Sequence, residues 1–228
     1  MDMYTSVVRF FQDGGVFMYP IVLVLALGVA IAIERWLYLQ STESRNRALW
    51  KRIAPQLQAG NFQAAAQEAG KSKAAIGNVL SYGFARIRSA GRRDDIEKAM
   101  EESLMEVMPR LEKRTHYLAT FANVATLLGL LGTIIGLIRA FTAVAGANPA
   151  DKADLLSASI SVAMNTTAFG LMAAIPMLLM HTLLQTKTSE IIDGLEMASV
   201  KFLNAITERR DPAPQPGKAQ VKAQAAAA

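Results

Sequence analysis

Three long stretches of this sequence contain no Asp, Glu, Lys or Arg. They are residues 16–33, 117–138 and 155–186, with lengths of 18, 22 and 32 residues. A transmembrane helix needs about 20 predominantly apolar residues to cross a bilayer core of roughly 30 Å. The alternative is a soluble bundle with three buried helices, and the lengths of the second and third stretches argue against it. The sequence therefore predicts an all-α membrane protein with three transmembrane helices.

The first stretch also has to be compared with a secretory signal peptide. A signal peptide has a basic leader, and small residues mark its cleavage site. Here the apolar run lacks a basic leader and is followed by Glu34, Arg35 and Trp36. A transmembrane helix is therefore the better interpretation. The third stretch is longer than the bilayer core requires, so we expect its helix to protrude on one side or to tilt.

The distribution of Lys and Arg predicts the orientation of the chain. Residues 37–117 contain 14 of these cations and residues 187–228 contain six, whereas residues 1–15 and 140–154 contain one each. Because basic loops stay in the cytoplasm, we expect the N-terminus and the short link in the periplasm. The predicted order is a periplasmic N-terminus (1–15), the first transmembrane helix (16–36), a cytoplasmic helical region (37–116), the second transmembrane helix (117–140), a periplasmic link (141–154), the third transmembrane helix (155–186), a cytoplasmic helix (187–210) and a disordered tail (211–228).

The cytoplasmic parts are expected to form long helical extensions of the membrane spans. Gly60-Asn61 should end one helix and start another. From Asp94 onwards apolar residues recur at helical spacing, and Pro109 should kink or restart this helix before it enters the membrane. The helix after the third span also has an apolar stripe, and the two stripes should pack against each other and against neighbouring subunits. The stripe positions are Ile96, Met100, Leu104, Val107, Leu111 and Leu118 in the first helix, and Ile191, Leu195, Ala198, Phe202 and Ile206 in the second.

The composition disfavours several classes of function. The chain has no cysteine, which excludes disulfides and thiol catalysis. Charged residues make up 19% of the chain, so a highly charged nucleic-acid binder is not expected. His116 and His181 have no partner at metal-ligand spacing, and Gly70-Lys71-Ser72 ends a phosphate-loop-like pattern without the strand that such a loop requires. We therefore expect neither an enzyme nor a bound cofactor.

Small and polar residues are concentrated in the second and third apolar stretches. Gly132 and Gly136 form a small-xxx-small pattern that favours close helix packing. Hydroxyl and amide side chains are costly to expose to lipid, so they should join helices to one another or line an ion-conducting lumen between subunits. The candidate pore-lining residues are Thr126, Thr133, Ser161, Asn165, Thr166 and Thr167, and the candidate packing residues are Gly129, Gly132, Gly136, Gly170 and Pro176.

Two segments within these stretches resemble one membrane-protein family. They are Leu-Leu-Gly-Leu-Leu-Gly-Thr at 127–133 and Thr-Thr-Ala-Phe-Gly-Leu-Met-Ala-Ala-Ile-Pro at 166–176. Together with the three spans and the long loop after the first span, they resemble the ExbB/TolQ/MotA family of ion-driven inner-membrane motor subunits. The chain length and the short outer link favour the ExbB/TolQ branch over the four-span flagellar stators.

The resemblance implies partners, a site and a function. Members of this family form a pentamer, and its central pore holds a dimer of a single-span ExbD-, TolR- or MotB-like partner whose aspartate carries a proton or a sodium ion. Thr133 and Thr167 match the family's pore-lining threonines. The expected function is the ion-conducting stator ring of a TonB–ExbB–ExbD-type motor in the bacterial inner membrane, together with a TonB-like protein. Such a motor couples proton or sodium motive force to energised outer-membrane transport. The alternatives are a Tol-type, gliding or flagellar-like stator subunit, or a passive membrane scaffold.

The sequence departs from the family pattern at two positions. Val162 stands where ExbB and TolQ usually have glutamate, and Thr126 stands where they usually have proline. The doubled Thr166-Thr167 is more similar to sodium-driven stators and adds an oxygen ligand for a hard cation. These features favour sodium, although the partner's carboxylate alone could carry protons. Arg139 is expected either to set the potential at the pore mouth or to anchor its helix at the membrane interface.

Overall fold

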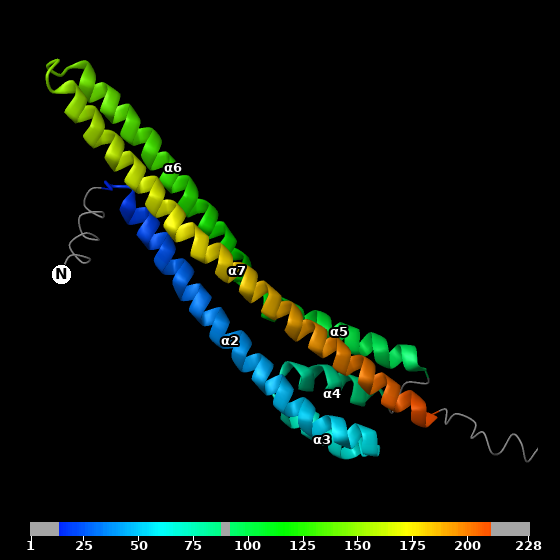
Figure 1. Ribbon diagram of the computed structural model, residues 1–228. Coiled ribbons are helices and arrows are strands. Elements are labelled where there is room, and N and C mark those ends of the chain that lie inside the picture. Colours follow the sequence, from blue (N-terminus) through cyan, green and yellow to red (C-terminus); the bar gives the residue numbers. More distant parts are fainter. Residues whose placement is uncertain (1–13, 88–91, 211–228) are drawn as a thin grey trace, which may run out of the picture. The chain divides into compact units, whose positions relative to one another are not determined.

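The computed structural model describes residues 14–87 and 92–210, except for the side chains of residues 209 and 210. Within these ranges every regular element is an α-helix (Figure 1). Long apolar stretches suited to crossing a membrane occur in α2, in the α5–α6 region and in α7. The prediction of an all-α chain with three membrane spans is thereby confirmed, while the predicted tail at 211–228 and most of the predicted periplasmic N-terminus lie outside the described residues. The helices are α2 (Met18–Ala59), α3 (Phe62–Lys71), α4 (Ala75–Ile87), α5 (Arg93–Glu112), α6 (Thr115–Ala145) and α7 (Lys152–Arg210).

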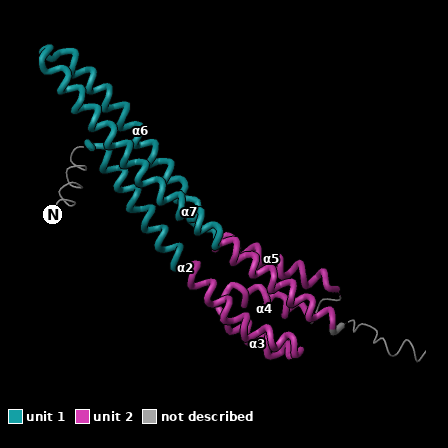
Figure 2. The backbone as a smooth tube through the Cα atoms, in the orientation of Figure 1, with its two compact units in different colours: residues 1–38, 112–187 teal, residues 39–111, 188–228 magenta. Residues whose placement is uncertain are grey.

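The chain divides into two compact units, which Figure 2 distinguishes by colour. The first unit comprises residues 1–38 and 112–187, and it contains all three apolar stretches. The second unit comprises residues 39–111 and 188–228, and it contains most of the predicted cytoplasmic parts. Both α2 and α7 contribute residues to each unit, so the spans continue as helices beyond their apolar stretches.

The core of the first unit forms where α2, α6 and α7 meet. Small residues on α6 and α7 allow close contact, and larger side chains from α2 and α7 fill the remaining space. On α2, Gly28 lies against Met177 of α7, and a methyl group at position 28 would collide with the Met177 side chain. The buried core residues are Ile21, Ala122, Ala125, Ala173, Ala174 and Met177.

The second unit has an apolar core formed by residues from α2, α3, α4, α5 and α7. The Phe84 ring of α4 meets the Phe202 ring of α7 edge to face, with centroids 4.8 Å apart. Of the predicted stripe positions, Leu104 is half-buried and every other one is buried, which confirms the helical spacing on both helices. Those residues on α5 and α7 that lie in this unit therefore belong to one core within the subunit.

The sequence predicts a helix boundary at Gly60-Asn61 and a kink or restart at Pro109, and the structure has the boundary but no restart at the proline. As expected, α2 ends at Ala59 and α3 starts after Asn61, whose side chain accepts a hydrogen bond from the Ala64 N–H at 3.3 Å. By contrast, Pro109 lies inside α5, and the helices separate at Lys113-Arg114, where Arg114 has a φ of +66°. Proline removes one N–H donor from a helix, whereas a left-handed residue turns the chain out of the helix altogether.

Candidate functional site

The hydroxyl groups of Thr133 on α6 and Thr167 on α7 are hydrogen-bonded to each other. The Thr133 hydroxyl also lies 3.3 Å from the Gly129 carbonyl oxygen and 3.2 Å from that of Ala163, and the Thr167 hydroxyl lies 2.9 Å from the Gly129 carbonyl oxygen. Each hydroxyl has one proton to donate, so one can donate to the other and the second to a carbonyl. Both threonines are half-buried in the single subunit.

Glycines bring α6 and α7 close enough for this contact. A methyl group on Gly170 would lie 2.7 Å from the Ala125 carbonyl oxygen and 3.1 Å from the Gly129 Cα. A methyl group on Gly129 would lie 3.2 Å from the Thr166 carbonyl oxygen. At such distances a larger residue forces the backbones apart, because no flexible side chain is available to move. Gly136 is similarly close to Ala163. The glycines therefore set the separation at which Thr133 and Thr167 meet.

Thr166 faces a different part of the subunit from Thr167. Its side chain is buried, with 2% exposed, and its hydroxyl lies 2.7 Å from the Gly14 carbonyl oxygen and 3.0 Å from that of Val162. Adjacent residues of a helix point about 100° apart, so Thr166 and Thr167 lie on different faces of α7. Val162 lies on the same side, where a methyl group on Gly15 would be 3.3 Å from its side chain. Within the subunit, Thr166 thus connects α7 to the chain that leads into α2.

The remaining predicted site residues do not join the Thr133–Thr167 pair. The Thr126 hydroxyl is bonded to the Ala122 carbonyl of its own helix at 3.1 Å, and Thr126 is exposed. Asn165 is half-buried. The predicted residues that are exposed in the single subunit also include Ser161, Pro176 and Arg139.

A second group of residues, at the end of the first unit where the spans meet their basic flanks, was missed by the sequence reasoning. Glu34 and Arg114 form an ion pair with N–O distance 3.3 Å, although 80 residues separate them. The Lys187 ammonium lies 5.3 Å from the centre of the Trp36 ring. Charged and aromatic residues flank all three apolar stretches on the side rich in Lys and Arg, and this belt pattern could have indicated the cluster.

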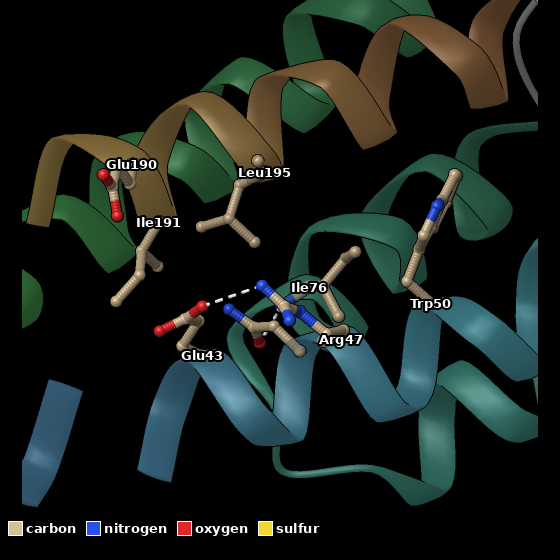
Figure 3. Close-up of a pocket in the computed structure, with 9 residues that line it drawn as sticks. Glu43, Arg47, Trp50, Ile76, Glu190, Ile191 and Leu195 are labelled. Atoms are coloured by element: carbon tan, nitrogen blue, oxygen red, sulfur yellow. Dashed lines mark hydrogen bonds and ion pairs between the residues drawn. The ribbon is translucent and has the colours of Figure 1, made fainter. Parts of the chain in front are cut away.

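The second unit contains a pocket of about 250 Å³ (Figure 3). Figure 3 shows Ile191 and Leu195 pointing from α7 toward the ion pair of Glu43 and Arg47 on α2, whose N–O distance is 3.0 Å. Beside it, the Ile76 N–H at the start of α4 donates to Asn46 Oδ1 at 3.2 Å. Among the described residues, no three His, Asp or Glu side chains are grouped to hold a metal ion. In this pocket Asn46 connects α2 to α4, whereas the Glu43–Arg47 ion pair lies within α2.

The sequence is similar to proteins of one family. The sequence model of the MotA/TolQ/ExbB proton channel family matches residues 71–197. A biopolymer transport protein ExbB homologue from Methanothermobacter thermautotrophicus is 27% identical over 86% of this chain and 69% of its own length. An ExbB-like biopolymer transport protein from Synechocystis is 28% identical over 80% of this chain and 72% of its own length. The Tol-Pal system protein TolQ from Haemophilus influenzae is 35% identical over 41% of each chain.

Proposed function

Because this chain belongs to the MotA/TolQ/ExbB proton channel family, we propose that it forms the ion-conducting stator ring of a TonB–ExbB–ExbD-type motor. In this proposal the ring lies in the bacterial inner membrane and couples ion flow to energised outer-membrane transport. The observation that carries the proposal is the bonded pair of hydroxyls at Thr133 and Thr167, placed between apolar helices at half-buried positions. These are also the two threonines that match the family's pore-lining positions.

The hydroxyl pair supplies oxygen atoms but no group that carries charge. Hydroxyl oxygens can accept a hydrogen bond from a protonated carboxyl group, or replace part of the water shell of an ion. The second and third apolar stretches contain no Asp or Glu. The proton or sodium carrier must then come from a second protein. This supports an obligatory single-span partner of the ExbD, TolR or MotB type, whose carboxylate passes the Thr133–Thr167 pair.

The proposed assembly is a pentamer of this chain around a partner dimer. The N-terminus and the link at 141–154 lie in the periplasm, and the second unit and C-terminus lie in the cytoplasm. The excess of Lys and Arg in residues 37–117 and 187–228 supports this orientation. A TonB-like protein would transmit the work in the TonB-type motor. The similarity to the Tol-Pal protein TolQ supports a Tol-type stator as the second candidate.

Ion flux in liposomes tests the proposal against a passive scaffold. The chain is reconstituted alone and together with a single-span partner of the ExbD, TolR or MotB type, and flux is driven by an ion gradient. We expect flux only with the partner present, because the chain lacks a membrane-embedded carrier in its second and third stretches. If the complex has its normal mass but carries no flux, the result would instead support a passive membrane scaffold.

A further inference from the structure

The charged residues of the second unit are segregated between two helices. On α2, every charged residue after Glu43 is basic, and these residues surround the exposed Ala48. On α5, every charged residue between Lys98 and Arg110 is a glutamate, and these residues surround Met105, whose side chain is 69% exposed. We define the basic face as Arg45, Arg47, Lys51 and Arg52 with Ala48, and the acidic face as Glu101, Glu102 and Glu106 with Met105.

Helical spacing places each set on the outer side of its helix. The buried residues of α2 in this unit include Asn46, Leu49 and Ile53, and all four basic residues are exposed. The buried residues of α5 include Met100 and Val107, and all three glutamates are exposed. Figure 1 shows α5 and the α2 segment of this unit on either side of α7. The two faces therefore point away from the core of their own subunit.

Several of these charges form no ion pair with any residue that the structure describes. Arg47 pairs with Glu43 and Arg52 with Glu68, but neither Arg45 nor Lys51 forms an ion pair within the residues that the structure describes. On the acidic face, no ion pair within the described residues involves Glu101, Glu102 or Glu106. Each face has a small or flexible apolar residue at its centre and charges around it. Protein interfaces have this arrangement, with an apolar centre and a polar rim.

We propose that the basic face of one subunit docks against the acidic face of a neighbouring copy of the same chain. Two different, complementary faces form a head-to-tail contact, and such contacts close into a ring when the rotation from one copy to the next closes. This inference rests on the proposed stator ring and specifies how its cytoplasmic units are joined. The charges fix which helices meet and oppose wrong registers, because like charges brought together repel.

Charge reversal and its rescue test the docking. One variant combines Arg45→Glu with Lys51→Glu, a second combines Glu101→Lys with Glu102→Lys, and a third combines all four changes. Ring mass is measured by native mass spectrometry in detergent across a dilution series, and helix content by circular dichroism. We expect each double variant to need roughly tenfold more subunit for half-assembly, because reversed charges then face like charges. The fourfold variant should recover assembly, since the four reversed charges again face charges of opposite sign.

A matched control excludes an effect of overall charge. The variant Asp193→Lys with Glu196→Lys changes the net charge by the same amount as the α5 variant, at exposed positions of α7 outside both faces. It should assemble normally. High salt should reduce the defect of both double variants, because the Debye length falls to about 3 Å at 1 M.

Four outcomes would overturn the docking. The first two are a fourfold variant that assembles no better than the double variants, and a control that assembles as poorly as the α5 variant. The third is normal assembly of both double variants. The fourth is an assembly defect in the α2 variant alone, which would mean that the basic face binds another anionic partner. A wild-type chain that never assembles would contradict the ring itself. Failed ion flux in a ring that shows the rescue would contradict only the proposed function.

Discussion

Thr133 and Thr167 share a hydrogen bond between their hydroxyl groups across the contact of α6 and α7. The contact is narrow because Gly129 and Gly170 face each other nearby. The backbone carbonyls of Gly129 and Ala163 complete the polar surroundings of the pair. In an apolar layer such a group of oxygens is kept only if it is internally satisfied or used by a ligand.

We predict that Gly170→Ala weakens the contact between α6 and α7. The added methyl group would lie 2.7 Å from the Ala125 carbonyl oxygen, so the backbones must separate. The expected destabilisation is about 1–3 kcal/mol, the usual cost of overpacking. Thermal unfolding in detergent measures it. Gly194→Ala is the matched control, because no described residue beyond its own stretch of helix lies within 4 Å of the position that its methyl group would take, and it should not lower the unfolding temperature. Equal unfolding temperatures for both variants would contradict the assigned close packing.

We predict that Thr166→Val lowers stability while leaving ion flux per assembled complex close to that of the wild type. Valine keeps the shape of threonine but leaves the Gly14 carbonyl without the donor at 2.7 Å. Losing a buried hydrogen-bond partner costs about 1–3 kcal/mol. Unfolding temperature and liposome flux are measured on the same preparation. Loss of flux with unchanged stability would mean that Thr166, and not only Thr167, belongs to the ion pathway.

The geometry of Thr166 also bears on which ion is used. The sequence-based preference for sodium counted Thr166 as an additional oxygen ligand next to Thr167. In the structure its hydroxyl is bonded to the Gly14 carbonyl, so fewer oxygens surround the proposed pathway. A sodium site needs several oxygen ligands, whereas a carboxyl group and a hydroxyl suffice to pass a proton. We therefore predict that flux persists when potassium replaces sodium at a fixed proton gradient, and that a protonophore abolishes it. Flux that requires sodium would reverse this prediction.

The sequence was sufficient to predict the fold, but not which residues the side chains of the site would contact. Runs of 22 and 32 uncharged residues determine the spans, and helical spacing identifies the buried stripe that includes Leu195 and Phe202. The partner of Thr166 could not be predicted, because Gly14 is 152 residues away along the chain. The belt of charged residues could indicate the cluster around Glu34 and Arg114, but not the pairing of two residues 80 positions apart. The break between α5 and α6 depends on the left-handed backbone at Arg114. Arginine rarely adopts this conformation, so the sequence does not predict the break there.

The most direct test of the central claim is ion flux through the Thr167→Val and Thr167→Ser variants, each reconstituted with the partner in liposomes. Valine removes the hydroxyl and keeps the branched shape, whereas serine keeps the hydroxyl and removes a methyl group. Thr182→Val serves as a control, because that exposed hydroxyl is bonded to the Leu178 carbonyl of its own helix. If the hydroxyl belongs to the ion pathway, Thr167→Val abolishes flux in complexes of normal mass, while Thr167→Ser and Thr182→Val retain it. Wild-type flux in Thr167→Val would contradict the assignment.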